Sequence, residues 1–417
     1  DSKQTLIDEF NSAQFGFSGS TFKRKGFGRR FSLNYTSSSF NSDQWLPGDP
    51  TLVYDNLNNW DYLHSKLTET NSGKDRTYYS DQTLKGSNIL NYSGEQRVEA
   101  YYLMNQTTLA DAHKLVFGVR KESTEMNAQT DPNLVPSIYA ERKGQIIEDD
   151  FLPAISYTWE HGDRGNMNLR FAIGQTIARP TFYEFTPVRI SDNALGITVE
   201  GNPDLVQSNV DNYDIRWEWF PTEAEIISLG YFYKDFENPI VNTALSIGTS
   251  PLYSWTNAPT GTIQGIEFEI RKEFLGYFNS GLNFTKIEAE ISPLVDSEGK
   301  VLSSNTTFVG QPEIIYNINA GVSLEKYRVT SNVFYNYVGE YLTNVSTSDR
   351  IPDLFQDESF SLDFNLAAEV MDNWKLKFSA TNLLNPVNRI YYSGTKSKTA
   401  QEYKKGRAFG LSLSWSY

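Results

Sequence analysis

Large apolar residues and polar residues alternate along most of the chain with a period of two. Between Asn212 and Trp219, every second residue is apolar, and the residues between them are mostly charged. The same alternation recurs in further copies, among them Ile266, Phe268 and Ile270 against Glu267, Glu269 and Arg271, and the apolar residues of 360–366 and 409–417 against Ser, Asp, Asn and Gly. Because successive side chains of a β-strand point to opposite faces, the pattern predicts strands with one apolar and one polar face.

These segments are longer than the strands of soluble proteins. Strands in globular proteins average about five or six residues, whereas a tilted strand needs about 9–11 residues to cross a bilayer. The pattern predicts about 15 such strands, near residues 14–24, 28–38, 94–107, 112–125, 149–161, 166–178, 208–220, 224–237, 261–274, 278–292, 310–325, 328–341, 357–370, 373–385 and 404–417. Their length favours a transmembrane antiparallel up-and-down β-barrel, an all-β fold.

The connections between these strands fall into two alternating classes. Tight turns are expected at Lys25-Gly26, Ala110-Asp111, Gly162 to Gly165, Pro221 to Glu223, Leu275-Gly276, Lys326-Tyr327 and Asp372-Asn373. Long polar loops are expected at 39–93, 126–148, 179–207, 238–260, 293–309, 342–356 and 386–403, and no helix is needed anywhere. Short turns at one rim and long loops at the other are typical of an outer-membrane barrel.

A soluble propeller is the main alternative fold, because the tight turns recur roughly every 50 residues, near the period of kelch repeats. A propeller blade has four short strands for each repeat, whereas this chain has two long ones. The membrane barrel is therefore the better interpretation. Single-chain bacterial barrels have an even number of strands, so fifteen strands predict that the first one runs toward the periplasm and that an odd number of strands precedes it.

Composition removes several other classes of protein. The 417 residues include 37 Lys and Arg against 51 Asp and Glu, a formal net charge of −14, which argues against nucleic acid as a partner because phosphate binding requires a basic surface. No apolar run approaches the roughly 18 residues of a membrane-spanning helix. The 25 Tyr, 26 Phe and 8 Trp are many for a chain with negative mean hydropathy. In a barrel they would face lipid or form girdles at the two rims.

A set of motifs carries a resemblance to a known family. They are Ala178-Arg179-Pro180 with Phe182 and Glu184, Gly201-Asn202-Pro203-Asp204-Leu205, Asn212-Tyr213-Asp214, Phe232 to Phe236 with Asn238-Pro239-Ile240, Gly265 to Glu269, Thr381 to Asn385, and the terminal aromatic Tyr417. In this order and spacing they resemble the TonB-dependent receptors, particularly the large outer-membrane transporters of Bacteroidetes, over roughly residues 150–417.

The resemblance implies the fold and the partners. Family members have a 22-stranded barrel closed by an N-terminal plug, so residues 1–417 would be strands eight to twenty-two, without the plug, the TonB box or the first strands. It implies an outer-membrane location in a Gram-negative bacterium and contact with outer-membrane lipids. It further implies coupling to TonB and its inner-membrane motor through the N-terminal region, and it is compatible with a surface lipoprotein partner.

Two groups of residues are candidates for the functional surface. Asp214, Arg216, Glu218, Glu267, Glu269 and Arg271 are expected to face the lumen, where opposite charges tile the barrel wall. Ligand-binding candidates are the rings that interrupt polar loops: Trp45, Trp60, Tyr62, Tyr253 and Trp255. Such rings can stack on a ligand, anchor the loops or sit at the membrane interface. Arg179 is expected to be a solvated arginine at the rim rather than one paired with an acidic group.

The sequence gives little support for a catalytic or metal-binding site. The three histidines, His64, His113 and His161, fall on different connections, so no catalytic triad is predicted. The chain has no Cys and no His pair at metal-ligand spacing, so no catalytic residue, metal or cofactor is expected.

The sequence therefore predicts a transporter that takes up a scarce nutrient, such as a siderophore or an oligosaccharide, through a plugged barrel. Two alternatives stay open: a barrel that serves as a structural or docking component of a larger outer-membrane complex, and a passive porin.

Overall fold

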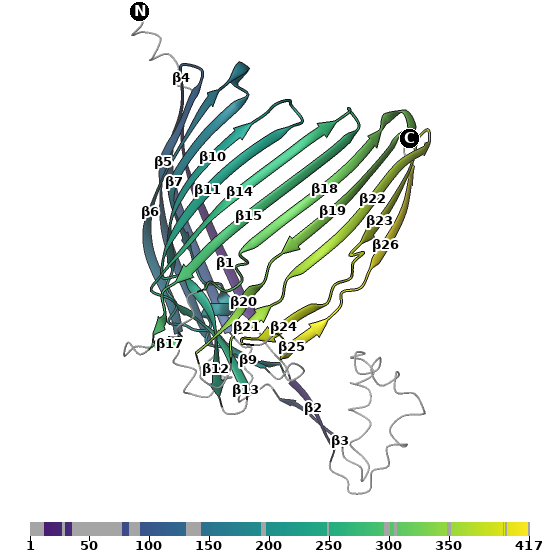
Figure 1. The fold of residues 1–417 in the computed structure, drawn as a ribbon. Helices are drawn as coiled ribbons and strands as arrows, with labels where there is room; N and C mark the ends of the chain where they lie inside the picture. The colour runs from purple at the N-terminus through teal and green to yellow at the C-terminus, as the bar shows by residue number, and fades with distance from the viewer. Residues whose placement is uncertain are drawn as a thin grey trace, which may run out of the picture.

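A computed structural model describes residues 12–26, 30–35, 77–82, 92–130, 143–192, 197–247, 250–295, 301–303, 307–347, 352–394, 396 and 398–415. Its main element is one curved antiparallel sheet of fourteen strands, seen in Figure 1 as a wall of long tilted arrows. In sheet order the strands are β1 (Ser12–Gly26), β4 (Tyr92–Leu109), β5 (His113–Thr130), β6 (Lys143–His161), β7 (Met167–Ala178), β10 (Ser208–Trp219), β11 (Ile226–Glu237), β14 (Thr260–Phe274), β15 (Phe278–Ile291), β18 (Ile314–Leu324), β19 (Val329–Val338), β22 (Ser359–Met371), β23 (Trp374–Thr381) and β26 (Ala408–Trp415).

The two faces of this sheet differ as the alternation predicts. On one face, which we call the apolar face, large side chains are exposed: Phe15 is 85% exposed and Leu411 73% exposed. Rings gather near both ends of the strands on this face, with Trp374 beside Trp415 at the turn rim and Tyr316 stacked on Tyr337 near the loop rim. An exposed apolar band between aromatic girdles is the lipid-facing surface of a membrane barrel.

The tight turns lie at the rim opposite the long loops. Ala110, Asp111, Leu275 and Asn373 all have positive φ angles, between 50° and 68°, and Gly276 follows Leu275 with φ 73°. Short 3₁₀ turns, η3 (Asp163–Gly165) and η4 (Glu325–Tyr327), close two further hairpins. These connections confirm the predicted turns, except at Lys25-Gly26.

The beginning of the chain differs from the prediction. Lys25 and Gly26 end β1, which pairs along its whole length with β4. The predicted strand 28–38 overlaps β2 (Arg30–Tyr35), which pairs instead with β3 (Thr77–Gln82) in a separate hairpin within the connection from β1 to β4. The main sheet thus has fourteen strands, and β1 runs opposite to β26. The predicted direction of the first strand is therefore wrong, because residues 30–35 belong to a pair of loop strands and not to the wall.

Several of the long loops contain β-strands where the structure describes them. Four of them contribute to a second, mixed sheet at the loop rim, in the order β25-β24-β21-β20-β12-β13-β9-β8, which we call the loop sheet. Its strands are β8 (Arg189–Asp192), β9 (Ile197–Glu200), β12 (Ile240–Ile247), β13 (Ser250–Asn257), β20 (Tyr341–Ser346), β21 (Leu354–Gln356), β24 (Asn388–Tyr392) and β25 (Thr399–Tyr403). Figure 1 shows these strands together below the long strands.

Two parallel pairings join different loops within the loop sheet. Thr243 of β12 pairs with Val345 of β20, and Tyr253 of β13 pairs with Val199 of β9. A fifth loop adds the small hairpin of β16 (Leu294–Val295) and β17 (Val301–Ser303). Its Leu294 and Phe308 are buried against Val241, Leu342 and Val345 of the loop sheet. The loops therefore have a shared apolar core.

Helical structure is minimal in the described residues. The one α-helix there, α4 (Phe182–Phe185), is a single turn that Thr181 and Glu184 close with a capping box. No described helix is long and apolar enough to cross a membrane.

Candidate functional site

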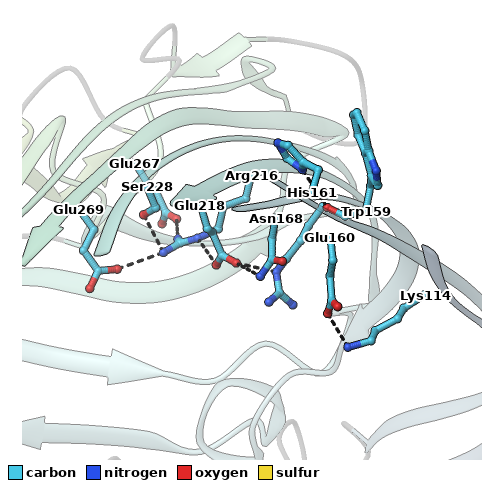
Figure 2. A network of polar contacts seen from close by, with 11 residues as sticks. Lys114, Trp159, Glu160, His161, Asn168, Arg216, Glu218, Ser228, Glu267 and Glu269 are labelled. Carbon is cyan, nitrogen blue, oxygen red and sulfur yellow. Dashed lines mark hydrogen bonds and ion pairs between the residues drawn. The ribbon is translucent and has the colours of Figure 1, made fainter. Parts of the chain in front are cut away.

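The predicted wall charges form a chain of ion pairs on the face opposite the apolar one. Arg216 donates to Glu218 at 3.1 Å and to Glu269 at 3.0 Å, and it lies 3.5 Å from Glu267. Arg170 of β7 donates to the other oxygen of Glu218 at 2.8 Å, and Arg271 lies 3.2 Å from Glu269. Figure 2 shows Arg216 between these carboxylates. We call this series of ion pairs the charge ladder.

The strand register explains the charge ladder. Arg216 is directly opposite Arg170 of β7 on one side and Gly230 of β11 on the other. Gly230 has no side chain, so the guanidinium reaches across β11 to the carboxylates of β14. It also donates to Ser228 of β11 at 2.9 Å. Five of the six predicted wall residues are thus brought together. The sixth, Asp214, lines a cavity of about 520 Å³ with Gly174 and Lys234.

Arg179, the first residue after β7, is paired rather than solvated. It donates to Glu122 of β5 at 2.5 Å, and Arg120 donates to the other oxygen of Glu122 at 2.6 Å. The side chains of Arg179 and Glu122 are only 17% and 11% exposed. The expectation of a solvated arginine is therefore wrong, because the loop that starts at Arg179 folds against the wall instead of extending outward.

The other end of the same loop is bound to the same part of the wall. Gln207, the residue before β10, donates to Asp150 of β6 at 2.8 Å, and Asp150 is the register partner of Glu122. The second oxygen of Asp150, the oxygen of Gln207 and Nε of Arg179 are buried without a hydrogen-bond partner. Buried polar groups of this kind commonly bind ordered water.

Near its start, this loop packs two aromatic rings against the wall. Phe185 of α4 is fully buried, and a Cβ atom on Gly144 of β6 would come within 2.6 Å of its ring. Phe182 lies in the same way over Gly94 of β4. Both rings pack against Met126, Ala128 and Ile146, with Leu205 from the same loop. We call this set of contacts the phenylalanine latch. It fixes the two ends of this loop, through Phe182 and Phe185 on one side and Leu205 on the other, against β4, β5 and β6.

Of the predicted ligand-binding rings, Tyr253 and Trp255 lie on one face of β13, whereas Trp45, Trp60 and Tyr62 lie outside the described residues. Trp255 packs against the phenylalanine latch and meets Tyr183 edge to face, with ring centroids 5.2 Å apart. Burial raises the pKa of Tyr253 and of Tyr183. Tyr183 was not a sequence candidate. The signal that could have found it is its position between Phe182 and Glu184 of the family motif.

Two cations of the loop sheet, Lys396 and Arg389, are paired with carboxylates in the part of the chain that the structure describes. Lys396 pairs with Glu340 at 2.6 Å and with Asp357 at 3.1 Å, and the hydrogen bond to Glu340 is the main cause of its raised pKa. Arg389 lies 3.4 Å from Glu402. Three lysines without an ion pair among the described residues, Lys398, Lys404 and Lys405, flank β25. This strand is at the edge of the loop sheet farthest in pairing order from β8 and β9.

The histidines that the structure describes belong to the outer surface. His161 stacks on Trp159 with ring centroids 4.5 Å apart, and His113 shares a 2.7 Å hydrogen bond with Tyr157. All four residues lie near the turn rim. Glu160, between the two stacked residues, points to the other face, where it pairs with Lys114 (Figure 2). His64 lies outside the described residues. No group of three or more potential metal ligands occurs within the described part of the chain.

One family match covers most of the chain. A family model described as "TonB dependent receptor-like, beta-barrel" matches residues 2–383. No curated protein matches the chain. The siderophore receptor PiuA from Acinetobacter baumannii has a similar structure, with a TM-score of 0.61 and 14% identity over 97% of this chain and 53% of that one.

Two further solved structures have the same fold. The ferric-catecholate import receptor Fiu from K12 E. coli gives a TM-score of 0.58 at 13% identity over 81% of this chain and 46% of its own. The ferric yersiniabactin uptake receptor FyuA from Yersinia pestis gives a TM-score of 0.55 at 16% identity, over 81% of this chain and 48% of its own. At such low identity the likeness shows the fold alone. The chain spans about half the length of these receptors.

Proposed function

The chain belongs to the TonB-dependent receptor family, and we propose that the protein whose barrel it helps to form takes up a scarce nutrient across the outer membrane of a Gram-negative bacterium. In this proposal TonB and its inner-membrane motor supply the energy through a plug domain. Residues 1–417 supply the later strands of the barrel, with the apolar face in contact with outer-membrane lipids.

The observation that carries this proposal is the loop sheet. Four loops pair with one another over one rim, and the phenylalanine latch fixes one of them against the wall. A fixed set of strands over the mouth of a barrel can present a preformed surface to a ligand, which reduces the cost of ordering on binding. Binding residues are commonly carried by loops on a rigid scaffold. In the proposed receptor, Tyr253 and Trp255 contribute to that surface, and the charge ladder holds the inner wall together.

The test is growth and uptake in the source bacterium, with the gene intact, deleted, or intact in a strain without TonB. We expect both mutant strains to lose the uptake of the same nutrient from a panel of iron complexes, vitamins and oligosaccharides. A deletion strain that takes up every nutrient normally would contradict the proposal.

Two further measurements address the alternatives. A passive porin would show steady conductance in planar bilayers, whereas we expect the full-length protein to be nearly closed. A docking component would co-purify with an outer-membrane assembly that falls apart in the deletion strain while uptake continues.

A further inference from the structure

Four side chains form a continuous row across three strands of the loop sheet and the adjacent helix α4. Asn344 of β20 donates to the side-chain oxygen of Asn242 of β12 at 2.9 Å. Trp255 of β13 is the cross-strand partner of Asn242, so both side chains lie on one face. Trp255 then meets Tyr183 of α4 edge to face. We call Asn344, Asn242, Trp255 and Tyr183 the amide–aromatic row.

The amide–aromatic row is accessible to a ligand, and neighbouring residues fix its position. The outermost ring, Tyr183, is 47% exposed, and the other three members are partly exposed. Trp255 is backed by the phenylalanine latch, and its carbonyl oxygen accepts from Asn202 at 2.9 Å. Asn257, at the end of β13, bonds both the N–H and the carbonyl oxygen of Val206. The ring pair is therefore fixed before any ligand arrives.

The two asparagines of the row leave polar atoms available to a ligand. The bond between the two asparagines uses the oxygen of Asn242 and the amide of Asn344. It leaves the amide of Asn242 and the oxygen of Asn344 for a ligand, one donor group and one acceptor. Strands in a sheet lie about 4.8 Å apart, so these carboxamides and the Trp255 ring span about 10 Å. The row is long enough to contact several linked rings of a ligand.

Charge around the row disfavours an anionic ligand. Residues 238–259, which include β12 and β13, contain no charged residue. The loop at 179–207 contains Arg179 and Arg189 against four acidic residues, and Arg179 is already neutralised by Glu122. Binding of an anionic chelate would require cations that face it, because a desolvated charge must be paired.

We propose that the amide–aromatic row binds an uncharged, polyhydroxylated ligand of the carbohydrate class. The Tyr183 ring stacks on the C–H face of a sugar ring, and the two carboxamides exchange hydrogen bonds with its hydroxyl groups. This assignment rests on the proposed uptake function and names the class of its substrate.

The experiment measures binding by the purified full-length protein in detergent. The probes are uncharged oligosaccharides of glucose, xylose and mannose on an array, and the ferric tris-complex of dihydroxybenzoate as the anionic probe. We expect saturable binding of at least one oligosaccharide series and none of the ferric complex. Tyr183→Ala should weaken the oligosaccharide binding about tenfold, which corresponds to about 1.4 kcal/mol for the lost stacking on the ring.

The variants separate recognition from folding. Tyr183→Phe keeps the ring and should bind nearly as well as the original chain. Asn242→Leu keeps the approximate volume, removes the amide and should also weaken binding about tenfold. Tyr277→Ala, at the exposed turn rim, is the matched control and should bind unchanged. Each variant must show the heat-dependent gel mobility of a folded barrel.

Three outcomes would overturn the assignment. They are no oligosaccharide binding by the original chain, full binding by a folded Tyr183→Ala protein, and saturable binding of the ferric complex that Tyr183→Ala abolishes. None of these contradicts the proposed uptake, because the shared loss of one nutrient's uptake in the deletion strain and in the strain without TonB does not require that nutrient to be a sugar.

Discussion

The turn rim and the loop rim of this sheet are built in different ways. At the turn rim, most turns contain one or two residues with positive φ angles, as at Ala110-Asp111 and Leu275-Gly276. At the loop rim, segments that are far apart in the sequence hold one another, as where Thr243 pairs with Val345. The turns depend on local backbone preference, whereas the loops depend on contacts that form only after the wall has assembled.

Residues of the two rims should contribute differently to the stability of the protein. A turn residue contributes mainly its own conformational energy. A residue of the phenylalanine latch contributes to the burial of a core shared by several strands. Substitutions at the loop rim should therefore cost more than substitutions at the turn rim, and the wall between the two rims should be intermediate.

The largest effect is expected for Phe185→Ala. Phe185 is fully buried, and removal of a buried phenylalanine ring costs about 3–5 kcal/mol. The residues 179–207 should become sensitive to trypsin and chymotrypsin while the wall stays folded. Limited proteolysis of the protein in detergent measures this, with Tyr327→Ala at the exposed turn rim as control. Equal protease resistance of Phe185→Ala and the original chain would show that the phenylalanine latch does not hold the loop.

A somewhat smaller loss is expected for Arg179→Ala. The substitution leaves the buried Glu122 with Arg120 as its one remaining ion-pair partner, and removal of one partner of a buried pair costs about 3 kcal/mol. Arg179→Lys should recover part of this loss. The free energy of unfolding in urea, compared across Arg179→Ala, Glu122→Gln and the double variant, gives the coupling. Strict additivity would mean that the two groups do not interact.

A modest effect is expected in the charge ladder. Arg216→Ala should lower the free energy of unfolding by about 1 kcal/mol, because Glu218 keeps its bonds from Arg170 and Asn168 and the pairs are partly solvated. The same urea titration measures it, with a salt series as an internal check. An Arg216→Ala loss as large as that of Arg179→Ala would show that the wall and the loop rim do not differ.

The smallest effect, of opposite sign, is expected for Leu275→Gly. Leu275 has φ 57° and is exposed. A left-handed conformation costs a non-glycine residue about 1–2 kcal/mol, and the greater freedom of glycine in the unfolded chain returns part of that gain. The protein should become about 0.5 kcal/mol more stable. Leu275→Ala is the control and should not gain stability, so an equal gain would exclude backbone strain as the cause.

The same contrast explains what the sequence could predict. The wall strands were predictable because alternation is a local signal, and the positions of Arg216 and Glu218 on the charged face follow from parity alone. β18 begins later than the pattern indicates because Pro312 lacks a backbone N–H for the sheet. β23 ends earlier than the pattern indicates because Asn382 and Asn385 have positive φ angles. At the first hairpin, one local signal did not distinguish a wall strand from a loop strand.

The loop sheet could not be predicted from alternation. Its strands have three to eight residues among those described, and their partners lie up to about one hundred residues away, so no short window contains the pairing. Tyr183 was missed for the same reason. Its neighbour Trp255 comes from a different loop, and the contact depends on the phenylalanine latch that places α4 beside β13.

The parallel pairings between loops have a consequence for how such a barrel can diversify. Where loops are independent, each can change length or be exchanged without regard to the others. Here β12 is shared between its own hairpin and β20, and β13 between that hairpin and β9. An insertion in one loop would shift the register of its neighbours. A change of ligand specificity in evolution, or a graft in the laboratory, would have to replace these loops together.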